Sequence, residues 1–191
     1  MTKSELRKYY LSLRLGMTEE EVLKKSLLIA GHLFSWALYQ NAKTLHTYVS
    51  SRSKREIDTF HVIDNALQAG KRVAVPKMMA GSRLKHCSLP SIDSLRTNQW
   101  DIPEPVDTPE IDTSEIDLIL VPMAVTDLRC NRIGYGKGYY DRFLGETAAV
   151  KVGLILDSQI HTHILPVEEH DIPMDFVISE SGFKEGDLKL F

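Results

Sequence analysis

The hydrophobic residues that follow Thr18 recur at the spacing of one face of a helix. Thr18 and Glu21 stand ahead of them in the arrangement of a capping box, in which each side chain bonds the backbone amide of the other residue. The pattern therefore predicts one long amphipathic helix that ends near Asn41.

The rest of the chain alternates short apolar runs with a second predicted helix, which Asp58 or Thr59 can cap and Gly70 ends. The apolar runs are typical of β-strands and cover residues 44–49, 72–76, 84–89, 116–126, 151–156 and 175–179. Pro76 is expected to end its strand. The fourth run is nearly continuous, as in a parallel strand buried on both faces. Alternating strands and helices predict an α/β fold: a single-domain, Rossmann-like layered structure over 1–191, with a mostly parallel central sheet flanked by helices.

Composition and charge narrow the classes of function. A formal net charge of -3 gives no basic field for nucleic acid, and no nucleic-acid-binding motif occurs. The first residues carry charges where a secretory signal would be apolar, and the apolar runs are too short for a membrane span. Cys87 and Cys130 lack metal-ligand spacing and fit a reducing compartment. We expect a cytoplasmic protein, a monomer or weak homodimer, that binds neither nucleic acid nor membranes.

Three alternating glycines, in NRIGYGKGYYDRFL (131–144), stand directly before a helix predicted to begin near Tyr139. The segment is neither the dinucleotide fingerprint nor a Walker loop. Glycines nevertheless let backbone amides approach an anion, and the N-terminus of a helix adds partial positive charge. Arg132 and Lys137 supply cations beside the loop. The segment favours a phosphate site, and the alternative is an ordinary glycine turn with solvated charges.

The stretch RIGYGKGYYDRFL closely resembles the signature of the 5-formyltetrahydrofolate cyclo-ligase family, also called methenyltetrahydrofolate synthetase. Four further segments resemble family elements in family order: KSELRK (3–8), REIDTFHVIDNALQAGKRVAVPK (55–77), WDIPEP (100–105) and PVEEHDIPMDFVIS (166–179). The resemblance implies an enzyme that uses ATP and Mg²⁺ to convert 5-formyltetrahydrofolate into 5,10-methenyltetrahydrofolate, with release of ADP and phosphate. It implies that the formyl oxygen is phosphorylated to an iminophosphate before N10 closes the ring.

The resemblance also assigns roles to residues. Nucleotide binding falls to Lys3, Arg7, Arg132, Ile133, Gly134, Tyr135, Gly136, Lys137, Gly138, Tyr139 and Tyr140. The middle of that loop, 135–139, also lies against the folate, whose other expected contacts are Ser51, Glu56 and Trp100. The expected catalytic residues are Lys137, Arg132 and Tyr139. If the segment from Lys3 to Arg7 is helical, the two cations share one face and reach the same phosphates.

Two positions of the expected folate site, Glu56 and Tyr135, allow more detailed expectations. The carboxylate of Glu56 can accept the adjacent 2-amino and N3 donors of a pterin in bidentate fashion. Family members often carry Arg or Gly where this chain has Tyr135. Any guanidinium contribution at that position is therefore absent or supplied from elsewhere in the chain.

The resemblance assigns magnesium ligation to Asp141 and Asp171. Carboxylate oxygens from two loops suit a hard cation that also contacts phosphates. Without the resemblance, the residues leave open which of Glu168, Glu169 and Asp171 contacts the metal.

The residues considered without the resemblance leave other functions open. A sugar-phosphate isomerase or CoA-transferase relative would share the layering and the anion loop, but would need neither ATP nor the pair Glu56 and Trp100. A non-catalytic nucleotide- or folate-binding regulator would keep the loop, but the presence of Lys137 and Asp141 argues for an enzyme. A short histidine cluster suggests zinc, but it has no cysteine partner and we expect it to be solvated: His161, His163 and His170.

Overall fold

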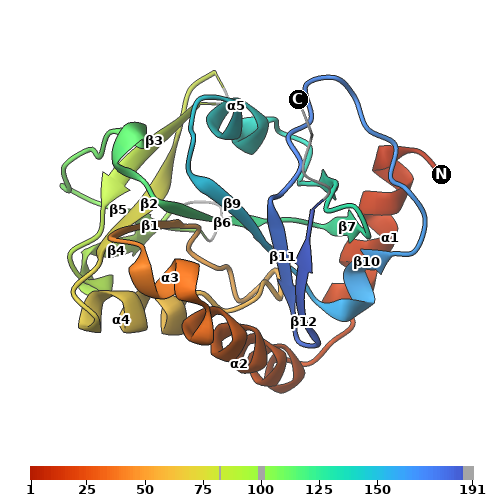
Figure 1. Ribbon diagram of the computed structural model, residues 1–191, viewed down its shortest axis with the longest axis horizontal. Coiled ribbons are helices and arrows are strands. Elements are labelled where there is room, and N and C mark those ends of the chain that lie inside the picture. Colours follow the sequence, from red (N-terminus) through yellow and green to blue (C-terminus); the bar gives the residue numbers. More distant parts are fainter. Residues whose placement is uncertain (82, 99–101, 187–191) are drawn as a thin grey trace.

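The computed structural model describes residues 1–81, 83–98 and 102–186, with the elements labelled in Figure 1. Its α-helices are α1 (Lys3–Leu15), α2 (Glu19–Ser35), α3 (Ala37–Asn41), α4 (Phe60–Gln68) and α5 (Tyr139–Gly145). Its strands are β1 (Thr44–Thr47), β2 (Arg72–Met79), β3 (Arg83–Ser88), β4 (Leu95–Thr97), β5 (Pro103–Pro105), β6 (Leu118–Pro122), β7 (Val125–Asp127), β8 (Arg132–Ile133), β9 (Val150–Leu154), β10 (Ile160–His161), β11 (Phe176–Ser179) and β12 (Gly182–Glu185). Short 3-10 helices cover Ile92–Ser94, Thr113–Glu115 and Asp157–Gln159.

Within the described residues, the central sheet has seven strands in the order β12-β11-β9-β6-β1-β2-β3. The five inner strands pair in parallel, whereas the edge strands β12 and β3 are antiparallel to their neighbours. Two smaller sheets have the orders β10-β7-β8 and β4-β5. The predicted α/β fold with a mostly parallel central sheet flanked by helices is confirmed.

Helices cover both faces of the central sheet (Figure 1). The core on the side of α2, α3 and α4 includes Leu33 and Leu120, and the core on the side of α5 includes Ile119 and Phe143. β6 contributes to both cores because successive side chains of a strand point to opposite faces. All of its residues are buried, as the continuous apolar run predicts.

The first helix, α1, packs beside the small β10-β7-β8 sheet rather than on the central sheet (Figure 1). Leu6 and Tyr10 form a buried cluster there with Val125, Ile133 and Leu165. This cluster places the N-terminal helix directly beside the strand that leads into the glycine loop. No helix in the described part of the chain is long and apolar enough to cross a membrane.

The long helix predicted over 18–41 is in fact two helices. The capping box of Thr18 and Glu21 is present, but Trp36 has extended backbone angles, φ -85° and ψ 128°, and separates α2 from α3. The indole packs edge-on against Phe176, with ring centroids 4.8 Å apart, and also contacts Phe183. The break therefore serves a packing contact with the β11–β12 hairpin, which helical periodicity does not reveal.

Thr59 occupies the N-cap position of α4 but its side chain does not cap the helix, and Asp58 supplies the side-chain hydrogen bond instead. The backbone amide of Phe60 donates to Asp58 Oδ1 at 2.8 Å, whereas the Thr59 hydroxyl donates to the carbonyl of Tyr48. Gly70 follows the helix with φ +74°, a left-handed conformation that favours glycine.

Pro76 does not end its strand, so that prediction was wrong. β1 pairs with β2 as far as Ala74, whereas β3 pairs with it as far as Met79. Beyond Ala74, the strand pairings in the described part of the chain join β2 to β3 alone, and a strand paired on one side tolerates a residue without an N–H.

The run over 116–126 is two strands in two different sheets, not one. After β6 ends at Pro122, the amide of Ala124 donates to Ile133 and its carbonyl accepts from the Gln159 side chain at 2.6 Å. The chain then continues as β7 in the small sheet. Both strands are fully buried, so their apolar pattern does not show the boundary.

Candidate active site

The β7–β8 hairpin carries the glycine loop, residues 134–138, to the start of α5. Asp127 holds this hairpin by accepting from the amides of Arg129 at 2.9 Å and Asn131 at 3.0 Å. The same carboxylate accepts from the amide of Leu165 at 2.9 Å. One buried aspartate therefore ties the glycine loop to the segment that leads to residues 168–171.

The glycines of the loop make room for two guanidinium groups. A Cβ atom on Gly134 would lie 2.9 Å from Nη1 of Arg132, and one on Gly136 would lie 3.0 Å from Cζ of Arg7. Gly136 also has φ +82°, which side chains rarely adopt. In addition, Nε of Arg7 donates to the carbonyl of Gly134 at 2.6 Å. In this structure, the groups that approach the loop backbone closely at these glycines are therefore the guanidinium groups of the protein's own arginines.

Lys3, the other predicted cation of α1, contacts the loop of residues 168–171, here called the acidic loop. Lys3 Nζ lies 2.5 Å from Asp171 Oδ2 and 3.4 Å from Glu168 Oε1. Burial raises the pKa of Asp171, but hydrogen bonds from Lys3 and the Glu168 amide outweigh it and lower the pKa overall. Lys3 and Arg7 are helical as expected, so spacing of four residues puts both cations at this site.

Buried Arg132 and partly exposed Asp141 form an ion pair across the loop, through Nη2 and Oδ1. Burial lowers the pKa of the Arg132 guanidinium, and the negative charges of Asp141 and Asp171 oppose that shift. Both aspartates that the sequence proposes for metal binding thus lie in the electrostatic surroundings of one arginine.

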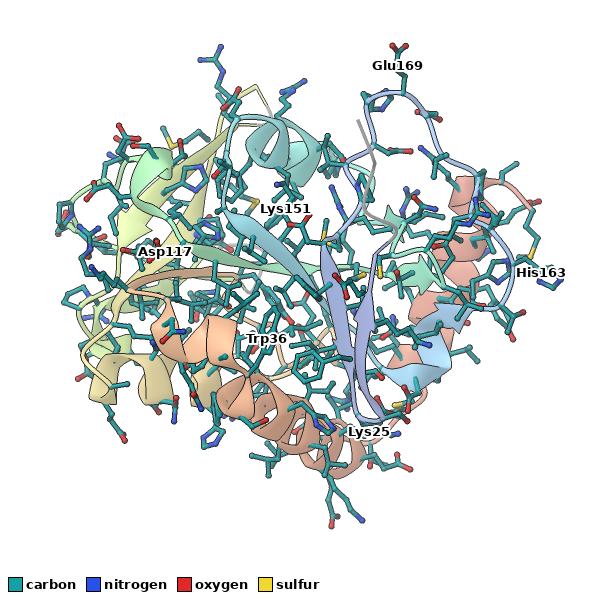
Figure 2. All side chains as sticks on the ribbon, in the orientation of Figure 1. Lys25, Trp36, Asp117, Lys151, His163 and Glu169 are labelled. Carbon is teal, nitrogen blue, oxygen red and sulfur yellow. The ribbon has the colours of Figure 1, made fainter. Side chains whose placement is uncertain are left out.

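Ligand atoms of Glu168, His170 and Asp171 lie within 4.8 Å of one another, the one such group in the described part of the chain. Asp141 is not a member of this group. Glu169 is exposed and points outward from its loop (Figure 2). His161 instead contacts the hydroxyl of Tyr10 at 2.9 Å.

Glu56 and Ser51 lie together beside Tyr135 of the glycine loop. The backbone amide of Ser51 donates to Glu56 Oε2 at 2.8 Å, and the hydroxyl of Tyr135 donates to Glu56 Oε1 at 2.5 Å. Arg14 Nη1 donates to the same hydroxyl at 3.0 Å, and its guanidinium lies 5.6 Å from the centroid of the Tyr135 ring. Burial, reinforced by the charge of Glu56, raises the pKa of Tyr135, so its phenol stays a neutral donor.

Arg14 is a site residue that the sequence did not single out. It is 4% exposed and lies seven positions after Arg7 on α1. Since seven residues are close to two helical turns, Lys3, Arg7 and Arg14 share one face. That spacing was a signal in the sequence, but a charged residue on a helix is usually exposed, and its burial depends on the tertiary structure.

Several buried polar atoms around the loop lack hydrogen-bonding partners among the described residues. They are Nε of Arg14, Nε of Arg132 and the hydroxyl of Tyr140. Buried polar groups without partners are uncommon in folded proteins, and their concentration at one place is a property of binding sites.

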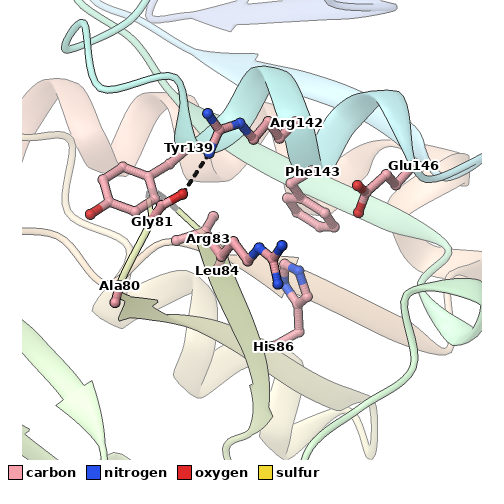
Figure 3. Close-up of a pocket in the computed structure, with 9 residues that line it drawn as sticks. All are labelled: Ala80, Gly81, Arg83, Leu84, His86, Tyr139, Arg142, Phe143 and Glu146. Atoms are coloured by element: carbon pink, nitrogen blue, oxygen red, sulfur yellow. Dashed lines mark hydrogen bonds between the residues drawn. The ribbon is translucent and has the colours of Figure 1, made fainter.

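The remaining predicted loop residues differ in exposure. Lys137 is exposed, Ile133 is buried in the cluster with α1, and Gly138 has φ +69°. Tyr139 begins α5, as predicted, and lines a cavity of about 810 Å³ between α5 and the β2–β3 hairpin (Figure 3). The cavity is lined by Ala80, Gly81, Arg83, Leu84, His86, Tyr139, Arg142, Phe143 and Glu146. The predicted folate contact Trp100 lies outside the described residues.

Known proteins are similar to this chain in both sequence and fold. A model of the 5-formyltetrahydrofolate cyclo-ligase family matches residues 1–180. Proteins named 5-formyltetrahydrofolate cyclo-ligase from Mus musculus and Escherichia coli K12 are 30% and 29% identical; the matches cover 87% and 88% of this chain and 88% and 94% of those proteins. The NMR structure of Aquifex aeolicus 5,10-methenyltetrahydrofolate synthetase matches with a TM-score of 0.86 and 31% identity, over 97% of this chain and 93% of that one. Likeness in sequence and fold over nearly the whole length means that the chain belongs to the 5-formyltetrahydrofolate cyclo-ligase family.

Proposed function

We propose that this chain catalyses the ATP- and Mg²⁺-dependent cyclisation of 5-formyltetrahydrofolate to 5,10-methenyltetrahydrofolate, with release of ADP and phosphate. The two folates are those that the names of its relatives specify. The observation that carries the proposal is the convergence of three distant segments. Arg7 of α1 bonds the glycine loop at Gly134, and Lys3 of the same helix bonds Asp171.

The chemical problem is a poor leaving group. A formamide oxygen leaves too slowly for N10 to close the ring by direct attack. Transfer of the terminal phosphoryl group of ATP to that oxygen gives an iminophosphate, N10 attacks the activated carbon, and phosphate departs. Phosphoryl transfer needs positioning and charge neutralisation more than covalent help from the protein.

The cations of the site suit this task. Lys3 and Arg7 bind the nucleotide phosphates together with the segment from Arg132 to Tyr140, which contains the glycine loop. Lys137 is exposed on that loop, where it can reach a phosphoryl group, and it stabilises the transferred charge. Arg132 lies in β8, directly before that loop, with Nε unpartnered in the described structure, so it retains a donor for a ligand.

The donor set of the acidic loop fits magnesium. Asp171 and Glu168 offer carboxylate oxygens close together, which is the chemistry that a hard cation prefers. Asp141 would supply a further oxygen from the start of α5. The bound ion would neutralise phosphate charge. Lys3 already contributes a positive charge between Asp171 and Glu168.

Folate binding is assigned to Glu56 and its surroundings. The carboxylate accepts the 2-amino and N3 donors of the pterin, with Ser51 and Trp100 as further contacts. Tyr139 connects the loop to the cavity of about 810 Å³, which is within the size range of small-molecule sites. We also expect a monomer or weak homodimer and a cytoplasmic location.

The test is an assay of the purified protein with 5-formyltetrahydrofolate, ATP and Mg²⁺, followed by the near-ultraviolet absorbance of the methenyl product. We expect product with the complete mixture, and none without ATP or in the presence of EDTA. Absence of product with folded protein would overturn the proposal, and product formation without ATP would overturn its phosphoryl-transfer step.

A further inference from the structure

The carboxylate proposed for pterin recognition is already engaged by the protein. Tyr135 donates to Oε1 of Glu56 at 2.5 Å, and the amide of Ser51 donates to Oε2. The space beside Glu56 and Tyr135 is a cavity of only about 10 Å³, roughly the volume that one water molecule requires. A bicyclic ring does not fit there while the Tyr135 side chain stays in place.

The geometry of Arg14 directs the Tyr135 hydroxyl toward Glu56. Nη1 of Arg14 donates to the phenol oxygen at 3.0 Å, so the hydroxyl hydrogen is left to point at the carboxylate. The guanidinium also lies against the tyrosine ring, 5.6 Å from its centroid, at a cation–π distance. Arg14 is buried and its Nε has no partner among the described residues. Its hydrogen bond to Tyr135 is thus one of few contacts that fix the group.

We propose that Arg14 is a positioning residue of the folate site, which acts by holding Tyr135 as an internal occupant of the pterin pocket. The tyrosine hydroxyl takes the place of a pterin donor on Glu56 and leaves when folate binds. The inference rests on the proposed function, because it takes Glu56 as the group that accepts the pterin.

The backbone beside Tyr135 is suited to this exchange. Gly134 and Gly136 flank the tyrosine, and Gly136 has φ +82°, so the loop can change its backbone angles at low steric cost. Arg7 contacts both glycines. Departure of Tyr135 therefore alters the same segment that we assign to the nucleotide phosphates.

The test is a double-mutant cycle on folate binding, with Tyr135→Phe and Arg14→Met. Tyr135→Phe keeps the ring and removes the hydroxyl that competes for Glu56. Arg14→Met keeps an apolar stem and removes the guanidinium. The Kd of 5-formyltetrahydrofolate is measured by calorimetry without nucleotide, and association rates are measured by stopped flow. The melting temperature of each variant is recorded separately.

We expect Tyr135→Phe to bind folate about tenfold more tightly, with faster association, since a hydrogen bond to a charged group no longer has to be broken. Arg14→Met should also tighten binding, by less, and should have no further effect in the Tyr135→Phe background. Additive effects of the two substitutions, or unchanged folate affinity in Tyr135→Phe, would overturn the inference. If Arg14 only stabilised the fold, Arg14→Met would lower the melting temperature, and its effect on folate affinity would not depend on the Tyr135 hydroxyl.

If Arg14→Met does not fold, Arg14→Lys takes its place in the cycle, because lysine keeps the charge and the stem but not the planar donor geometry. The wild-type protein separates the two proposals. Failure of the wild type to bind or convert folate counts against the proposed function. A wild type that does both, with Tyr135→Phe unchanged in affinity, counts against the role of Tyr135 and Arg14 alone.

Discussion

Nε of Arg7 donates to the carbonyl of Gly134 across 2.6 Å, and the same guanidinium packs against the bare Cα of Gly136. One side chain of the N-terminal helix therefore sets the path of the glycine loop. The contact requires a glycine, because a Cβ atom on residue 136 would lie 3.0 Å from Cζ of Arg7.

Gly136→Ala should impair nucleotide use more than folding. The positive φ costs an alanine about 1–2 kcal/mol in the free energy of unfolding. Displacement of Arg7 should raise the KM for ATP about tenfold or more. Steady-state kinetics with varied ATP and urea unfolding measure the two effects.

Two other glycines provide controls for this substitution. Gly138 has φ +69°, but a Cβ atom added there would meet nothing within 4 Å, so Gly138→Ala tests backbone strain without the Arg7 contact. Gly145→Ala introduces neither problem. If Gly138→Ala raises the KM for ATP as much as Gly136→Ala, the Arg7 contact is not the cause.

Lys137→Ala should lower kcat by about 10²–10³-fold, the usual effect of losing one preorganised group that stabilises transition-state charge. The melting temperature should barely change, because Lys137 is exposed and surface substitutions alter stability by about 0.5 kcal/mol or less. Lys8→Ala, at an exposed position of α1, serves as the matched control and should leave both quantities unchanged. Normal turnover with a large loss of stability would contradict the assigned role.

Asp171→Asn should raise the Mg²⁺ concentration needed for half-maximal activity by about tenfold, since a neutral amide is a weaker ligand for a hard cation. Asp141→Asn should act in the same direction. Activity measured over a magnesium titration gives the midpoint for each variant.

Glu169→Gln is the control for the acidic loop. Glu169 is exposed, points outward and is not in the group of Glu168, His170 and Asp171 (Figure 2). Its magnesium midpoint should match that of the wild type. An unchanged midpoint in Asp171→Asn together with a shifted one in Glu169→Gln would reassign the ligand.

The buried pair of His46 and His86 predicts sensitivity to acid. Nε2 of His46 lies 3.1 Å from Nδ1 of His86, and burial, together with the charge of His86, holds the pKa of His46 well below 6.5. Below about pH 6.5 the unfolded chain binds a proton that the folded chain does not. Stability should therefore be full above that pH and fall as pH drops, by up to about 1.4 kcal/mol per pH unit for each of the two histidines.

Urea unfolding at several pH values checks this expectation. His46→Leu should reduce the slope between pH 6.5 and the lowered pKa by one proton, while His86, whose pKa burial also lowers, still contributes. His163→Gln removes an exposed histidine and should leave the slope unchanged. Equal slopes in the wild type and His46→Leu would contradict the prediction.

Local patterns predicted the fold class well because the central strands are strongly apolar and α2 begins with a clear capping box. The capping box at Thr18 follows from two side chains three residues apart, and α5 begins at Tyr139 directly after the glycine at its N-cap. The errors have a common cause. Trp36 breaks a helix to reach Phe176, and β6 and β7 belong to different sheets, so in each case distant parts of the chain set the boundary. That residues 1–191 form one domain stays a prediction.

The sequence by itself determined the family, the α/β layering and the chemical character of the glycine loop, because these depend on residue types and spacings that are fixed along the chain. Tertiary structure decided which groups meet: Arg132 with Asp141, Lys3 with Asp171, and Arg14 with Tyr135 and Glu56. A contact between segments more than a hundred residues apart depends on how α1 packs beside the small sheet. Burial of a charged side chain such as Arg14 cannot be predicted from the neighbouring residues, since the same residue at the same helical spacing is usually solvated.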